Sequence, residues 1–208
     1  MSSINILITG IGGQGILSAS RLLSRAVLSE GGHVVVGDAF GASQREGSVV
    51  SNVRIGPEVH GPLIGYGMAD FLIAFEPFEA LRSIPYLSSD GVAIVNGTPI
   101  VPVGDLLSGS YPPLEDVWAQ LDKASGVVHR IDATHEASRI AARYGSRYDI
   151  TNVVILGAAS LIQGFPVDGD LLERTLQARF SEMVLSMNIE AVAAGRGLID
   201  RQKEERMQ

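Results

Sequence analysis

The 208-residue sequence contains no cysteine, so this chain can form no disulfide, no thiolate zinc site and no cysteine-ligated iron–sulfur cluster. If the protein takes part in redox chemistry, its electron carriers must be non-covalent cofactors or must belong to another polypeptide. No apolar run approaches the roughly 20 residues that a membrane-spanning helix needs. The start of the chain lacks the basic and then apolar stretches of a signal peptide, so we expect a cytoplasmic protein with no membrane partner.

Basic residues are also scarce. The sequence has 16 Lys and Arg residues against 23 Asp and Glu residues, which gives a formal net charge of −7. A nucleic-acid-binding surface needs clustered Lys and Arg side chains, so we expect no nucleic-acid partner. The hydrophobic content of 46% is that of an ordinary globular domain and excludes a disordered chain.

The first 40 residues have the pattern of a strand–helix–strand unit. Residues 4–9 form a short apolar run that ends at Gly10, and apolar residues then recur at helical spacing over 16–27. Residues 33–37 form a second apolar run, which predicts another strand. Such units build doubly wound sheets, so the pattern predicts a Rossmann-like α/β fold with a mostly parallel sheet.

The rest of the chain divides into a second α/β stretch and a helical third. We predict strands over 48–55, 71–75, 91–95 and 127–131, and helices from Pro77, over 114–124 and over 134–144, the last capped by Thr134. From residue 151 onward we predict three helices: a buried one over 153–162, one with a capping box at Asp170–Glu173, and one over 183–199 followed by a solvated tail. These elements predict a single domain over 1–208, with the sheet in 1–150 and a helical cap in 151–208.

A glycine-rich loop joins the first strand to the first helix. The stretch from Gly10 to Gly15 satisfies G-x-G-x-x-G, and its place between a strand and a helix gives the match its meaning. Backbone N–H groups at such a helix start favour a phosphate or a carboxylate. Asp38, after the second strand, stands where a ribose-binding acid would stand. Alternatively, the glycines only let the helix pack closely against the sheet.

A second unusual segment, residues 41–49 (G-A-S-Q-R-E-G-S-V), follows the second strand. This position places it at the carboxyl edge of the sheet, beside the glycine loop, where open α/β sheets bind ligands. Arg45 could hold an anion, and Gln44 offers both a donor and an acceptor; alternatively, the segment is a solvated loop with an Arg45–Glu46 pair. We predict no catalytic and no metal-ligating residue in this chain. The candidate cofactor-binding residues are Gly10, Gly12, Gly13, Gln14, Gly15, Asp38, Ser43, Gln44 and Arg45.

Together, G-x-G-G-Q-G and the G-x-x-Q-R-x-G-x-V motif about thirty residues later resemble the gamma-type domain of 2-oxoacid:ferredoxin oxidoreductases. A separate chain of about this length is most similar to the beta subunit of the indolepyruvate type. Asn152 with Gly157-Ala158, and Asn188 with Ala191 and Gly195, fit the asparagine-marked helices near the end of these proteins. One departure is Glu46, which replaces a glycine of the family's Q-R-G-G form and could partly neutralise Arg45.

The resemblance implies a small subunit of an enzyme that oxidatively decarboxylates a 2-oxoacid, an indolepyruvate or another arylpyruvate, to an acyl-CoA and reduces ferredoxin. It implies that thiamine diphosphate, magnesium and [4Fe-4S] clusters belong to a larger alpha-type partner, because this chain has no thiol and no G-D-G…N-N pattern. Coenzyme A would be the co-substrate, ferredoxin would be reached through the hetero-oligomer, and the chain would be inactive alone.

Two alternatives remain open at this point. One is a free-standing Rossmann-type oxidoreductase that binds NAD or a flavin, although the sequence has no Tyr-x-x-x-Lys pair to accompany the glycine motif. The other is a purely structural assembly subunit.

Overall fold

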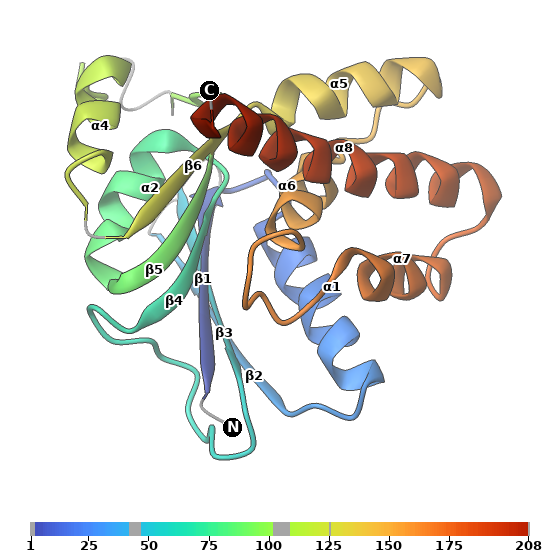
Figure 1. The fold of residues 1–208 in the computed structure, drawn as a ribbon, viewed down its shortest axis with the longest axis horizontal. Coiled ribbons are helices and arrows are strands. Elements are labelled where there is room, and N and C mark those ends of the chain that lie inside the picture. Colours follow the sequence, from blue (N-terminus) through green and yellow to red (C-terminus); the bar gives the residue numbers. More distant parts are fainter. Residues whose placement is uncertain (1–2, 42–46, 102–108, 125, 208) are drawn as a thin grey trace.

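The computed structural model describes residues 3–41, 47–101, 109–124 and 126–207 (Figure 1). Its sheet has six strands in the order β2-β3-β1-β4-β5-β6. The strands are β1 (Ile4–Ile11), β2 (Val34–Phe40), β3 (Ser48–Ile55), β4 (Ala69–Ala74), β5 (Leu87–Asn96) and β6 (Val127–Ile131). The helices are α1 (Ile16–Ser29), α2 (Pro77–Ser83), α4 (Leu114–Leu121), α5 (Ala133–Arg143), α6 (Thr151–Ala159), α7 (Gly169–Gln177) and α8 (Glu182–Met207), with a 3-10 turn over Ile84–Tyr86.

The sheet is mostly parallel, which confirms the predicted fold class, but its second strand does not lie where the strand–helix–strand pattern suggested. Strands β1, β4, β5 and β6 pair in parallel, whereas β3 runs antiparallel between β1 and β2. The chain therefore passes from β1 through α1 to the sheet edge and returns as β3 to pair with β1. Apolar periodicity marks strands but not their neighbours, so this insertion could not be read from the sequence.

Each face of the sheet is covered by its own group of helices (Figure 1). Ile6 and Ile8 of β1 belong to a large apolar cluster with α1, α5, α6, α7 and α8, whereas Leu7 points the other way into a smaller cluster with α2 and α4. This alternation is the two-residue period of a strand buried on both faces. The helices from residue 151 onward thus share one core with the sheet.

Several element boundaries differ from those predicted. Asp132 rather than Thr134 caps α5, and Asp168 rather than Asp170 caps α7. Helix α6 ends at Ala159, and α8 continues to Met207 instead of ending at residue 199. The extension of α8 crosses β6, where Gln202 hydrogen bonds to His129 Nδ1 and to the Arg130 carbonyl. This tertiary contact stabilises a segment whose charged sequence indicated a solvated tail.

Helices α6 and α8 cross at two glycines. A Cβ atom at Gly195 would overlap the Val154 carbonyl oxygen and would lie 2.7 Å from the Ala158 nitrogen. On α6, a Cβ atom at Gly157 would lie 2.8 Å from the Val192 Cα atom. The two backbones are therefore too close for any side chain at either position, and the glycines allow this approach.

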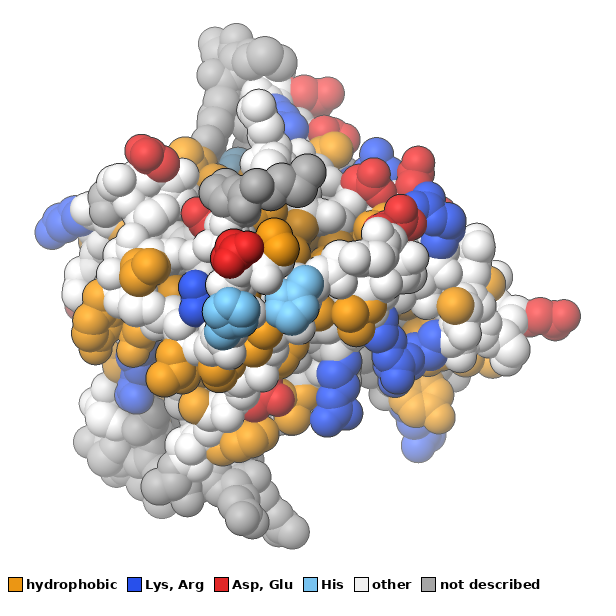
Figure 2. Space-filling view, turned by 90° about the horizontal axis from the view of Figure 1, so that it is seen from below, with side chains coloured by type: hydrophobic (Ala, Val, Ile, Leu, Met, Phe, Trp, Pro, Cys, Tyr) orange, Lys and Arg blue, Asp and Glu red, His pale blue; other side chains and the backbone are white. Residues whose placement is uncertain are grey.

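The end of the molecule where the parallel strands begin carries exposed hydrophobic side chains (Figure 2). In the 56–68 connection, Leu63 is 76% exposed, Tyr66 is 73% exposed and Met68 is 54% exposed. The ring of Tyr66 lies against that of Tyr86, with 4.5 Å between centroids. Among the described residues, no helix is long and apolar enough to cross a membrane.

We expect Gly195→Ala to lower the free energy of unfolding by about 3 kcal/mol or more, because the new methyl group would force α6 and α8 apart. Gly197→Ala is the matched control: it lies in the same helix, and its Cβ atom would approach only the end of Arg201, at 3.7 Å. Removing a helical glycine there should raise stability by up to about 1 kcal/mol. Equal effects of the two substitutions in urea denaturation would contradict the close crossing.

Candidate functional site

The glycine loop connects β1 to α1 at the carboxyl edge of the sheet. Gly13 and Gly15 have positive φ angles of 103° and 87°, and Gly15 is the N-cap of α1 without any side-chain cap. Gly12 donates its N–H to the Gly47 carbonyl at 2.8 Å. The structure thus places the glycine loop beside Gly47 of the second segment, of which residues 41 and 47–49 are described.

The side chain of Gln14 turns back into the loop. Its Oε1 atom accepts a hydrogen bond from the Ile11 N–H at 2.6 Å, and its Nε2 atom donates to the Phe75 carbonyl at 3.0 Å. The helices that follow β1 and β4 cover opposite faces of the sheet, so the gap between these two strand ends is its topological switch point. The Gln14 amide spans that gap. Its described polar bonds are to the backbone of this chain.

Asn96, at the end of β5, extends this set of amide contacts. Its Nδ2 atom donates to the same Phe75 carbonyl at 3.1 Å and to Thr134 Oγ1 at 2.9 Å. Its Oδ1 atom accepts from the N–H groups of Ala133 and Thr134, at 3.0 and 3.3 Å. Gln14 and Asn96, both bonded to one carbonyl, therefore connect the carboxyl ends of β1, β4 and β5 to the start of α5.

Asp38 lies away from the glycine loop. It belongs to β2, two strands from β1, and therefore stands about 10 Å from β1 within the sheet. Its Oδ1 atom accepts from Ser51 Oγ at 2.6 Å. Asp38 is therefore not at the position expected for a ribose-binding acid, because β3 occupies the place beside β1 where a Rossmann fold has its second strand. Ser43, Gln44, Arg45 and the neighbouring Glu46 lie outside the described residues.

A buried acidic cluster lies just behind the strand ends, on the α2 face. Glu76 caps α2 by accepting from the Glu79 N–H at 2.9 Å, and it also accepts from the Tyr111 hydroxyl. Glu79, only 4% exposed, accepts from Ser48 Oγ at 2.5 Å. Burial raises the pKa of the Glu76 carboxyl, and burial together with Glu76 raises the pKa of Tyr111. These contacts tie the first residue of β3 and the segment before α4 to the start of α2.

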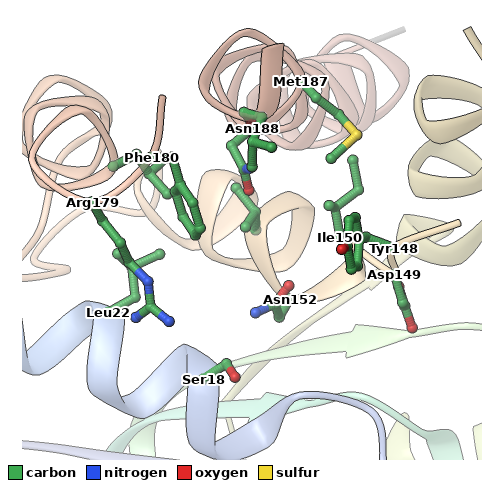
Figure 3. Close-up of a pocket in the computed structure, with 13 residues that line it drawn as sticks. Ser18, Leu22, Tyr148, Asp149, Ile150, Asn152, Arg179, Phe180, Met187 and Asn188 are labelled. Carbon is green, nitrogen blue, oxygen red and sulfur yellow. Dashed lines mark hydrogen bonds between the residues drawn. The ribbon is translucent and has the colours of Figure 1, made fainter. Parts of the chain in front are cut away.

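A pocket of about 240 Å³ opens beside the start of α1 (Figure 3). Its wall is largely apolar and includes Leu22, Phe180 and Met187. Figure 3 shows the Arg179 guanidinium and the Asn152 amide facing one space below the Phe180 ring, with Ser18 of α1 beneath it. Asn152 also lies against the glycine loop, because its side chain is 3.5 Å from the position of a Cβ atom on Gly15.

Asn96, the Glu76–Tyr111 pair and Arg179 belong to none of the sequence motifs. Asn96 could have been identified from the sequence, since a polar residue at the end of a buried strand lies at the ligand-binding edge of a parallel sheet. The Glu76–Tyr111 contact joins residues 35 positions apart, and Arg179 reaches the pocket because α7, which it follows, packs beside α1. No local pattern reports such contacts.

Comparison with known proteins places the whole chain in one group. The family described as "Pyruvate ferredoxin/flavodoxin oxidoreductase" matches residues 5–198. A protein of Thermococcus kodakarensis named "Indolepyruvate oxidoreductase subunit IorB" is 37% identical, with 94% of this chain and 95% of that protein covered.

Solved structures show the same fold. The pyruvate oxidoreductase subunit PORC from Thermotoga maritima has a TM-score of 0.69 at 24% identity, covering 94% of this chain and 96% of its own. The 2-oxoglutarate:ferredoxin oxidoreductase from Magnetococcus marinus has a TM-score of 0.68 at 23% identity, covering 97% of this chain but only 32% of its own. In that protein the fold is one part of a much longer chain.

We expect Gln14→Ala to lower the free energy of unfolding by about 2 kcal/mol, because the Ile11 N–H and the Phe75 carbonyl each lose a hydrogen-bond partner. Gln120→Ala, on the exposed face of α4, is the control and should be nearly neutral. Urea denaturation measures both. A loss below about 0.5 kcal/mol for Gln14→Ala would show that the amide bridge contributes little to stability.

The pH dependence of stability should report the burial of Glu76. Because its pKa is raised in the folded protein, the folded state holds this proton more tightly than the unfolded chain does. The resulting stabilisation is complete below the usual carboxyl pKa of 4.5 and is lost as pH rises through the raised value. The wild type should therefore lose stability relative to Glu76→Gln as pH increases over this range. Glu58→Gln, at an exposed carboxylate, is the matched control.

Proposed function

The chain belongs to the pyruvate ferredoxin/flavodoxin oxidoreductase family, and we propose that it is the small, thiamine-free subunit of an indolepyruvate- or arylpyruvate-oxidising member. The observation that carries this proposal is the 37% identity to an indolepyruvate oxidoreductase subunit over nearly the full length of both chains. The chain would take the place of that subunit in its own enzyme. The enzyme would convert the 2-oxoacid to an acyl-CoA and reduce ferredoxin.

The absence of cysteine supports a role that depends on a partner. Electrons released from a 2-oxoacid must leave through redox centres, and a chain without thiols cannot ligate an iron–sulfur cluster through cysteine. We infer that thiamine diphosphate, magnesium and [4Fe-4S] clusters are carried by a larger alpha-type subunit. That subunit would also bring ferredoxin to the complex.

The geometry of the carboxyl edge favours this role over that of a free-standing NAD or flavin enzyme. A dinucleotide in a Rossmann fold places its pyrophosphate over the glycine loop at the switch point. Here the Gln14 amide occupies that gap, and Asp38 is two strands away from the loop. A dinucleotide would have to displace two hydrogen bonds and would have no acid at the expected place for its ribose.

The carboxyl edge is also the surface that we propose faces the partner's active site or the path of coenzyme A. The glycine loop, the Gly47 end of the second segment and the Asn152 side chain meet there. The N–H groups at the start of α1, which has no side-chain cap, suit an anionic group. Gln44 and Arg45 would contribute from the second segment.

The exposed apolar side chains at the opposite end of the sheet are consistent with a subunit. Leu63 and Tyr66 are each more than 70% exposed, and aromatic and aliphatic residues of this kind are buried when subunits assemble.

Coexpression with a larger thiamine- and cluster-bearing subunit tests the proposal. We expect a stable complex that reduces ferredoxin with indolepyruvate and coenzyme A, whereas the purified chain alone should show no turnover. Oxidation of a 2-oxoacid by the isolated chain would refute the subunit role.

The same complex tests the role of the carboxyl edge. Gly12→Val should lower turnover at least ten-fold without preventing assembly, since the side chain would protrude beside the Gly47 contact. Gly197→Val is the control, because a Cβ atom there approaches only the end of Arg201, at 3.7 Å. Unchanged turnover in Gly12→Val would remove the glycine loop from the functional surface.

A further inference from the structure

The pocket between α1, α6 and α8 has the features of a small-molecule site separate from the blocked switch point. We propose that it binds a monocarboxylate that carries an aromatic or similarly compact apolar body. This proposal rests on the pocket alone and is independent of the assembly of the chain with a larger subunit.

The size and wall of the pocket define the apolar part of the ligand. An apolar cavity of about 150 Å³ accommodates benzene, so a volume of 240 Å³ is suited to a body of one or two rings. It is smaller than the roughly 300–1,000 Å³ of pockets for drug-sized ligands. Leu22, Val184 and Met187 provide aliphatic contacts, and Phe180 presents an aromatic ring.

Arg179 supplies a positive charge at one end of the pocket. Its guanidinium lies 5.2 Å from the Phe180 ring, and within the described part of the chain no carboxylate forms an ion pair with it. By contrast, Arg174 on α7 pairs with Glu30 at 3.2 Å. An arginine without a carboxylate, at the mouth of an apolar pocket, can bind the carboxylate of a ligand through two parallel hydrogen bonds.

The start of α1 reinforces this charge. Its first turn has no acidic residue and no side-chain cap, and Asn152 of α6 packs against Gly15, the N-cap of α1. The positive end of the α1 dipole thus lies near the space lined by Ser18, Asn152 and Arg179 (Figure 3). Hydroxyl and amide groups of Ser18 and Asn152 can donate to the same carboxylate.

The opposite end of the pocket orients the ligand. Asp149 lies there in Figure 3, and its Oδ1 atom accepts from the Thr151 N–H at 2.8 Å. Its negative charge disfavours a carboxylate at that end. The geometry therefore places the carboxylate beside Arg179 and the apolar body between Phe180 and Met187.

Phenylacetate is the probe, titrated into the full chain by calorimetry and by NMR. We expect saturable binding at one site, and none for 2-phenylethylamine, which has a similar body and the opposite charge. Arg179→Gln should weaken phenylacetate binding about ten-fold or more, because losing a hydrogen bond between charged groups lowers an affinity by about this factor. Arg174→Gln, at an exposed arginine outside this pocket, should leave the affinity unchanged.

A second variant tests the apolar part of the pocket while the charge of Arg179 is unchanged. Val184→Phe should fill the apolar end and abolish binding while Arg179 stays in place, with thermal unfolding used to confirm that the variant is folded. Equal binding of phenylacetate and 2-phenylethylamine, the same affinity in Arg179→Gln, or no saturable binding would each overturn the proposal. So would a Val184→Phe variant that binds phenylacetate normally but no longer assembles with the larger subunit, because the pocket would then be a subunit contact.

Discussion

The backbone carbonyl of Phe75 is the acceptor on which the carboxyl edge of the sheet depends. It receives hydrogen bonds from the side-chain amides of both Gln14 and Asn96, and these amides in turn bind backbone groups at the ends of β1 and the start of α5. Buried backbone groups in a parallel sheet must be satisfied where the strands end. Here two amide side chains satisfy them at the place where doubly wound proteins usually bind a nucleotide.

The pocket lies beside the switch point and not in it. The described cavity beside the glycine loop lies on its α1 flank, with α6 and α8 as its other walls. Asn152 of α6 and Met187 and Asn188 of α8 line it, together with Ser18 and Leu22 of α1 (Figure 3). The α2 face is closed by the Glu76–Tyr111 and Ser48–Glu79 contacts.

The family relationship and the physical constraints agree. A chain without thiol ligands, with an amide-filled switch point and with exposed hydrophobic residues at the far end of its sheet, has the properties of a subunit that completes an enzyme. Its fold alone would not distinguish this role from that of a nucleotide-binding enzyme, because both share the strand, glycine loop and helix. In this chain the Gln14 side chain lies in the gap where a dinucleotide would bind.

The sequence by itself determined the elements, the fold class and the position of the two motifs side by side, because apolar periodicity and glycine spacing are local properties that follow directly from the residues. It also led to the family, through G-x-G-G-Q-G and the Gln44–Arg45 segment. The insertion of β3 beside β1, the direction of the Gln14 side chain and the pocket at Arg179 were decided only by tertiary structure. Each of these depends on contacts between residues distant in the chain, and no local pattern encodes which distant partner a strand or a side chain will meet.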